Sequence, residues 1–123
     1  MPSVEHRAIK LTKGGLAFTW DDEKAKANMR KHGVSFFLAT DAFFDDGAIL
    51  SPNSIDEETG EERFAITGMT RLGVAFVVYV ERVSVEGRDV IRIISARRAE
   101  RKERDRYVAE LARAAGAGQG ARG

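Results

Sequence analysis

The spacing of apolar residues changes from a helical period to a period of two, and later changes back. In the first part of the chain, apolar positions recur every three to four residues behind two capping signals. The first predicted helix follows Asp21 or Asp22 and ends at about Lys31, before a glycine. The second begins at Ser35 and ends at a turn at 45–47. We therefore expect two short helices, packed as a hairpin, near the N-terminus.

From residue 48 onward, β-branched residues alternate with other residues, which is typical of strands. This pattern predicts an antiparallel meander with strands at 48–51, 63–70, 74–83 and 90–95. A helical period returns from about Arg98 to Ala115, and the glycine-rich tail from Gly116 is expected to be disordered. Residues 1–17 lack a clear period and predict a flexible leader that ends in a short strand around 16–20.

Together these elements predict a single α+β domain at residues 18–115. Its order is two N-terminal helices, an antiparallel β-sheet meander and a C-terminal helix. A chain of 123 residues is long enough to bury one hydrophobic core and too short for two.

The composition excludes several classes of site. The chain has no cysteine and two histidines, His6 and His32, so it offers no disulfide framework, no thiolate zinc site and no all-histidine metal cluster. No stretch approaches the roughly 20 apolar residues of a membrane span, and the first residues lack the apolar run of a signal peptide. We expect a soluble cytoplasmic protein that uses no metal and no cofactor.

The net charge of +1 hides an uneven distribution. Residues 41–62 contain eight acidic residues and no basic residue, whereas residues 97–106 contain six basic and three acidic residues. The first predicted helix also has a basic stripe with Lys24 and Lys31. Such runs are either solvated surface or one side of a complex with a polyanion, and both interpretations remain open.

The predicted turns set which residues face one another in the sheet. A two-residue turn at 86–87 pairs Glu81 with Arg92, and a three-residue loop ending at Gly73 pairs Arg63 with Glu81. A charged row of Arg63, Glu81 and Arg92 then crosses three strands. The same face would carry Ala65, Thr67 and the facing pair Tyr79 and Ile94. The opposite face would form the core with Phe64, Ile66, Phe76, Val78, Val80, Ile91 and Ile93.

Charges this close to a core are costly unless they are paired, so the row needs an explanation. One explanation is a cross-strand salt-bridge ladder. The other is a phosphate site, in which Glu81 holds the two guanidinium groups and acts as a general base. Arg97 and Arg98 follow the last strand, where a guanidinium can grip a phosphate with two hydrogen bonds.

His32 is a candidate for proton transfer, because an imidazole changes its charge near neutral pH. The alternative is a capping or packing role at the end of the first predicted helix. His6 lies in the leader, and we give it no role.

Three blocks of the sequence resemble the signature of BrnT-type toxins. The first runs from Phe18 to Ala25, followed by Asn28 and the segment 31–36, and the second is 62–68. The third is discontinuous and takes these parts: 77–82, 91–99, 103–104 and Tyr107. Together the blocks span about residues 18–107.

The resemblance implies a RelE-like microbial ribonuclease fold and an RNA-cutting toxin of a bacterial type II toxin-antitoxin system. It also implies a BrnA-like antitoxin that inhibits the toxin by burying its basic site, and that alone contacts operator DNA. By analogy the two proteins form a heterotetramer around an antitoxin dimer. The candidate functional residues carried over in the matched blocks are Lys24, His32, Arg63, Glu81, Arg92 and Arg97.

RNA supplies its own nucleophile, the 2′-hydroxyl, so a few arginines and one base suffice for a metal-independent endoribonuclease. We expect Glu81, Arg63, Arg92 and His32 to be catalytic. The expected RNA-binding residues are Arg97, Lys24, Lys31 and Arg98. The competing hypothesis is a non-catalytic module whose basic surface binds an antitoxin or a nucleic acid.

Overall fold

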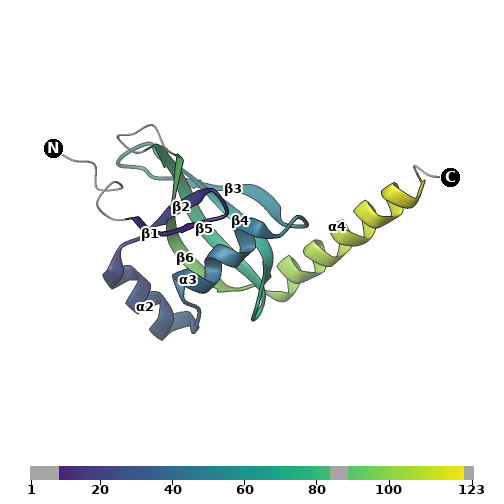
Figure 1. Ribbon diagram of the computed structural model, residues 1–123, viewed down its shortest axis with the longest axis horizontal. Coiled ribbons are helices and arrows are strands. Elements are labelled where there is room, and N and C mark those ends of the chain that lie inside the picture. Colours follow the sequence, from purple (N-terminus) through teal and green to yellow (C-terminus); the bar gives the residue numbers. More distant parts are fainter. Residues whose placement is uncertain (1–8, 84–88, 121–123) are drawn as a thin grey trace.

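The computed structural model describes residues 9–83 and 89–120 (Figure 1). One six-stranded sheet has the strand order β1-β2-β6-β5-β4-β3. The strands are β1 (Ile9–Lys13), β2 (Leu16–Thr19), β3 (Ile49–Ile55), β4 (Glu62–Thr70), β5 (Gly73–Val83) and β6 (Asp89–Arg98). The helices are α2 (Asp22–His32), α3 (Phe36–Ala39), the 3-10 helix η1 (Thr40–Phe44) and α4 (Arg101–Gly120).

The predicted α+β class is confirmed, but two details of the predicted order are wrong. The helices are not N-terminal elements, because the β1–β2 hairpin precedes them. The sheet is mixed rather than antiparallel, because β2 runs parallel to β6, with Thr19 beside Arg92. The hairpin turn uses Gly14 and Gly15, whose φ angles of 55° and 83° are readily adopted by glycine. Residues 9–13 of the predicted leader therefore form an edge strand.

Local capping explains both ends of α2. The side chain of Asp21 accepts a hydrogen bond from the backbone N–H of Lys24 at 2.9 Å, as expected for an N-cap. Gly33 ends the helix with φ of 70°, and its N–H donates to the Met29 carbonyl oxygen at 2.8 Å. Asn28 is buried although it lies on the same side of the helix as the exposed Lys24 and Lys31, and Met29 is half exposed.

Asn28 substitutes for a strand residue at the β6 edge. The parallel pairing of β2 ends with Thr19 beside Arg92, and Asn28 contacts the next part of that edge. Its Nδ2 donates to the carbonyl oxygen of Ala96 at 2.7 Å, and its Oδ1 accepts from the Ala96 N–H at 3.1 Å. Nδ2 also donates to the carbonyl oxygen of Val34 at 3.0 Å. One amide side chain thus fixes α2 along β6.

The hydrophobic core lies between one face of the sheet and the helices α3 and η1. Its buried residues are Phe18, Val34, Phe36, Ala39, Ala42, Ile66, Ala75, Val77, Tyr79, Ile93 and Ala96. Gly68 of β4 allows η1 to approach closely, because a Cβ at this position would lie 2.9 Å from the carbonyl oxygen of Ala42. The ring of Phe43 packs edge-on against Phe18 and Tyr79. We call this side of the sheet the core face.

Helix α4 leaves the end of β6 and projects away from the sheet (Figure 1). It continues to Gly120, five residues into the segment 116–123 that was expected to be disordered. The hydroxyl of Tyr107 anchors its second turn by donating to Asp45 Oδ2 at 2.6 Å. No helix in the described ranges is both long and apolar enough to cross a membrane.

Candidate functional site

The turn between β4 and β5 is one residue shorter than predicted. Thr70 pairs with Gly73, so the loop has two residues, and Phe64 lies beside Tyr79. The Thr70 hydroxyl closes this turn, donating to the Gly73 carbonyl oxygen at 2.7 Å and accepting from the Leu72 N–H at 3.1 Å. The predicted pairing of Arg63 with Glu81 is therefore wrong.

A β-bulge changes the register between β5 and β6. Val78 lies beside Ser95 as predicted, but Tyr79 lies beside Ile93, which leaves Ile94 as the extra residue. Past the bulge, Glu81 pairs with Ile91 instead of Arg92. The predicted turn at 86–87 lies outside the described residues.

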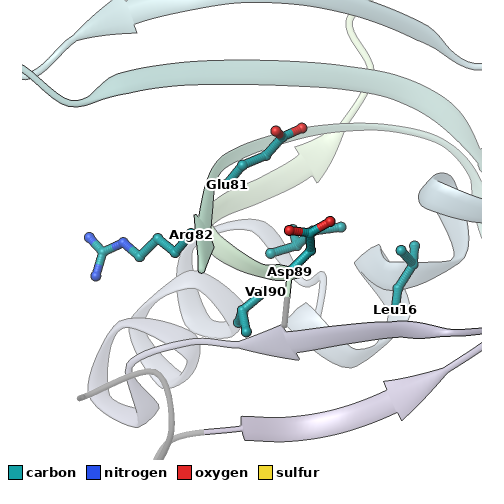
Figure 2. A pocket seen from close by; sticks show the side chains of 6 residues that line it. Leu16, Glu81, Arg82, Asp89 and Val90 are labelled. Atoms are coloured by element: carbon teal, nitrogen blue, oxygen red, sulfur yellow. The ribbon is translucent and has the colours of Figure 1, made fainter. Parts of the chain in front are cut away.

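Glu81 is consequently on the core face, not in a row with the arginines. It lies beside Ile91, in the same alternation as Tyr79, whereas Val80 lies beside Arg92. Figure 2 shows the side chain of Arg82 pointing away from those of Glu81 and Asp89. The predicted core was also wrong in part. Three residues expected there lie on the side of Arg92, and they are Phe76, Val78 and Val80.

Arg63 and Arg92 nevertheless share a row across the sheet. The shorter β4–β5 turn and the β5–β6 bulge each shift the predicted pairing by one residue, and the two shifts cancel for this pair. Continuing the β4–β5 register by one residue places Arg63 beside Val80, and Val80 lies beside Arg92. Val80 has no exposed surface. Thr19, on the far side of Arg92, is also fully buried. We call this side of the sheet the basic face, defined by Arg63, Arg82, Arg92 and Arg97.

Two arginines of the basic face are held by the acidic loop 56–61. Arg63 Nη2 lies 3.0 Å from Asp56 Oδ2. Arg82 makes a bidentate contact with Glu61, with Nε at 3.1 Å and Nη2 at 3.0 Å from the two carboxylate oxygens. Hydrogen bonds from the backbone N–H groups of Thr59 and Glu58, and then the charge of Arg63, keep the pKa of Asp56 below its usual range.

Arg97 is occupied by a carboxylate of α4. Its Nη1 and Nη2 each lie 2.8 Å from an oxygen of Glu103, and its guanidinium lies over the ring of Phe76 at 4.4 Å. This hydrogen bond raises the pKa of Arg97 and lowers the pKa of Glu103. Arg97 therefore fastens the first turn of α4 to the sheet. Arg98 has a different partner, since its Nη1 donates to the Leu72 carbonyl oxygen at 3.2 Å.

Arg92 differs from the other three arginines of this face. Within the described residues it makes no ion pair, although its charge, after the hydrogen bond from the Lys24 N–H, helps to lower the pKa of Asp21. The Asp21 carboxylate already caps α2. Arg92 is half buried, and it is the arginine of this face for which the described residues show neither a hydrogen bond nor an ion pair, so its guanidinium keeps the most donors for a ligand.

Residues 20–103 match the family model described as the ribonuclease toxin, BrnT, of type II toxin-antitoxin systems. The chain belongs to this family. The matched range covers more than half of the sequence and includes all four arginines of the basic face. No curated protein matches the chain. This BrnT toxin is therefore a ribonuclease toxin by family, and its membership of a type II system implies an antitoxin partner.

The remaining predicted residues of this BrnT toxin lie on α2, next to β6. Lys24 and His32 stand one turn before and one turn after the buried Asn28, and Lys31 precedes His32. Lys24 and Lys31 are exposed, and His32 is half buried. Among the described residues, His32 has no hydrogen bond to Arg63 or Arg92. The structure thus brings two of the four predicted catalytic residues into one row.

Glu81 instead lines a groove at the end of the sheet (Figure 2). This groove has a volume of about 350 Å³, and its lining includes Leu16, Glu81, Asp89 and Ile91. The neighbouring Tyr79 is nearly buried, and burial followed by the charge of Glu81 raises the pKa of its phenol. No group of three or more histidine, aspartate or glutamate side chains in the described ranges is arranged to hold a metal ion.

Sequence reasoning missed Arg82 and the two carboxylates that hold the arginines. The available signal was the acidic loop next to Arg63, which suggested a local partner for that arginine. Arg82 gave no comparable signal, because its face depends on the β5 register. With the correct register, Arg82 falls on the same face of β5 as Val80, and Glu61 is then within reach as its partner.

Proposed function

We propose that this BrnT toxin is a metal-independent endoribonuclease whose basic face binds RNA and positions the phosphate that is cut. The observation that carries the proposal is the row in which Arg63 and Arg92 flank the buried Val80. Residues two strands apart in a sheet are separated by about 10 Å at their Cα atoms. Two long guanidinium side chains extending from such positions can reach the same phosphate from either side.

This arrangement suits cleavage through the 2′-hydroxyl of the RNA. Attack of that oxygen on phosphorus gathers negative charge on the phosphate oxygens, and fixed guanidinium groups stabilise this charge in the transition state. Arg92 contributes donors that have no partner among the described residues, and Arg63 contributes a guanidinium held by Asp56. Each such group typically accelerates the reaction by about 100-fold or more.

The roles of the other predicted residues follow from their positions. Glu81 lies on the core face, so we assign it no step at a phosphate held by Arg63 and Arg92. We keep His32 as the candidate for proton transfer, because its helix borders β6. Contacts with flanking phosphates are proposed for the exposed residues Lys24, Lys31 and Arg98. Arg97 joins them only if a phosphate displaces Glu103.

The proposed partner is a BrnA-like antitoxin that blocks the toxin by covering the basic face. On this proposal operator DNA is bound by the antitoxin, and the complex is a heterotetramer around an antitoxin dimer. The same family analogy suggests that the sheet and helices form a RelE-like fold. These points rest on family membership rather than on contacts within this chain.

The decisive experiment incubates antitoxin-free protein with a single-stranded RNA, with and without EDTA. We expect cleavage in both conditions, and at least a tenfold loss in Arg63→Ala and in Arg92→Ala with the folded structure retained. Arg101→Ala removes the same charge from an exposed position on α4 and serves as the control. RNA that is bound but left intact by well-folded wild-type protein would support the non-catalytic alternative.

A further inference from the structure

The acidic loop 56–61 contacts the basic face at both of its ends. Asp56 is the first residue of the loop and forms an ion pair with Arg63. Glu61 is the last residue and forms an ion pair with Arg82. The two carboxylates are about as exposed as their partners, at 28% and 31% for the side chains. A solvated acidic run would not be expected to place both terminal carboxylates on arginines of one face.

The loop itself is closed by a set of local hydrogen bonds. Asp56 Oδ1 accepts from the N–H groups of Glu58 at 2.9 Å and Thr59 at 3.0 Å. The Asp56 N–H donates to the carbonyl oxygen of Glu61 at 2.9 Å, and the Gly60 N–H donates to the carbonyl oxygen of Asp56 at 2.8 Å. Gly60 has φ of 75°, which this closure needs. Backbone N–H groups of the loop thus hold the Asp56 carboxylate in place independently of its contact with Arg63.

The two oxygens of Asp56 have separate tasks. Oδ1 closes the loop, and Oδ2 contacts Arg63 Nη2. On the arginine side, Nε is buried and has no hydrogen-bond partner among the described residues. An unsatisfied buried donor is unfavourable, and among the described residues it is the contact with Asp56 that holds this guanidinium.

We propose that Asp56 and Glu61 are positioning residues that orient Arg63 and Arg82 for RNA on the basic face. The inference rests on the proposed function, because it takes that face to be the RNA site. A side chain whose rotation is already restricted loses less conformational freedom when a phosphate binds. The hydrogen-bonded loop would therefore make cleavage faster, although its charge repels RNA.

Orientation and charge predict opposite effects when a carboxylate is neutralised. If only charge matters, removing a negative charge near the site makes RNA binding tighter and cleavage no slower. If orientation matters, Asp56→Asn slows cleavage, because the substituted amide keeps an oxygen for the loop N–H groups but offers an N–H to Arg63. Glu57→Gln is the matched control, since this side chain is exposed and makes no ion pair with any of the described residues.

The test measures kcat and KM for cleavage of a single-stranded RNA by the full chain. For Asp56→Asn we expect kcat to fall about tenfold while KM changes less than about threefold. Glu57→Gln should equal or exceed the wild type. In the Arg63→Ala background, Asp56→Asn should cause no further loss, because its effect passes through Arg63. We expect Glu61→Gln to act in the same way through Arg82.

The outcomes separate this inference from the proposed function. If Arg63→Ala impairs cleavage but Asp56→Asn behaves like Glu57→Gln, the positioning role is overturned and the ribonuclease site stands. If the wild type does not cut RNA, the proposed function fails, and NMR of the arginine side chains decides the inference. Restricted rotation of the Arg63 guanidinium that is released by Asp56→Asn supports positioning, and unchanged rotation overturns it.

Discussion

The contact between Asn28 and β6 makes a quantitative prediction about stability. Asn28 is 7% exposed and makes three hydrogen bonds, two with Ala96 and one with Val34. Asn28→Ala leaves one backbone N–H and two carbonyl oxygens without these partners. Each buried polar group left unsatisfied costs about 1–3 kcal/mol. Because water can replace part of the lost bonding at this helix-sheet junction, we expect a loss of about 3 kcal/mol.

Such a loss is a large share of the total stability, which for a typical domain is about 5–15 kcal/mol. Urea unfolding followed by circular dichroism should measure it directly, and Tm should fall by about 10 °C. Lys31→Ala is the control on the same helix, because Lys31 is exposed, and it should change stability by less than about 0.5 kcal/mol. Asn28→Asp should cost at least as much as Asn28→Ala, since a carboxylate oxygen would then face two carbonyl oxygens.

Hydrogen exchange locates the effect. The Ala96 amide, which donates to Asn28 Oδ1, should exchange slowly in the wild type and much faster in Asn28→Ala. If Asn28→Ala is as stable as Lys31→Ala and the Ala96 amide stays protected, then the side chain does not substitute for a strand and the reasoning is refuted.

Two further predictions concern pH. Burial and the hydrogen bond to Asp45 raise the pKa of Tyr107 to about 12, so this contact stabilises the fold below the ordinary phenol pKa of about 10 and is lost as the pH rises further. Tyr107→Phe should therefore cost about 2 kcal/mol in urea unfolding at pH 7 and less at pH 11, and an equal cost at both would contradict this. Hydrogen bonds from Arg71, and then Lys13, keep the pKa of Asp41 well below 3.8. Asp41→Asn should lower Tm at pH 7, and its difference from the wild type should shrink as the pH falls below 3.8, whereas a pH-independent difference would exclude the ion pairs as its cause.

The helix ends were predictable because capping acts between near neighbours. Asp21 accepts from the N–H three residues later, and Ser35 does the same with Leu38 at 3.0 Å. Gly33 ends α2 through its own backbone conformation. In each case the donor and the acceptor lie within a few positions of each other, so the order of residues contains the information.

The two faces of β5 were not predictable in the same way. Both alternating sets of this strand are largely apolar, so hydrophobicity does not say which set is buried. One set is Ala75, Val77, Tyr79 and Glu81, and the other is Phe76, Val78, Val80 and Arg82. The choice depended on the length of the turn after Thr70 and on the bulge at Ile94. The parallel pairing of β2 with β6 likewise joins residues about 70 positions apart.

Local propensity, capping and residue identity were sufficient to predict the α+β class, the helix starts, the arginines of the last strands and the resemblance to BrnT toxins, which the family match confirms. The long-range pairing of the strands was needed to show that Val80, and not Glu81, lies between Arg63 and Arg92, and that the acidic loop reaches Arg63 and Arg82. Strand pairing sets the face of every side chain, and a shift of one residue reverses it.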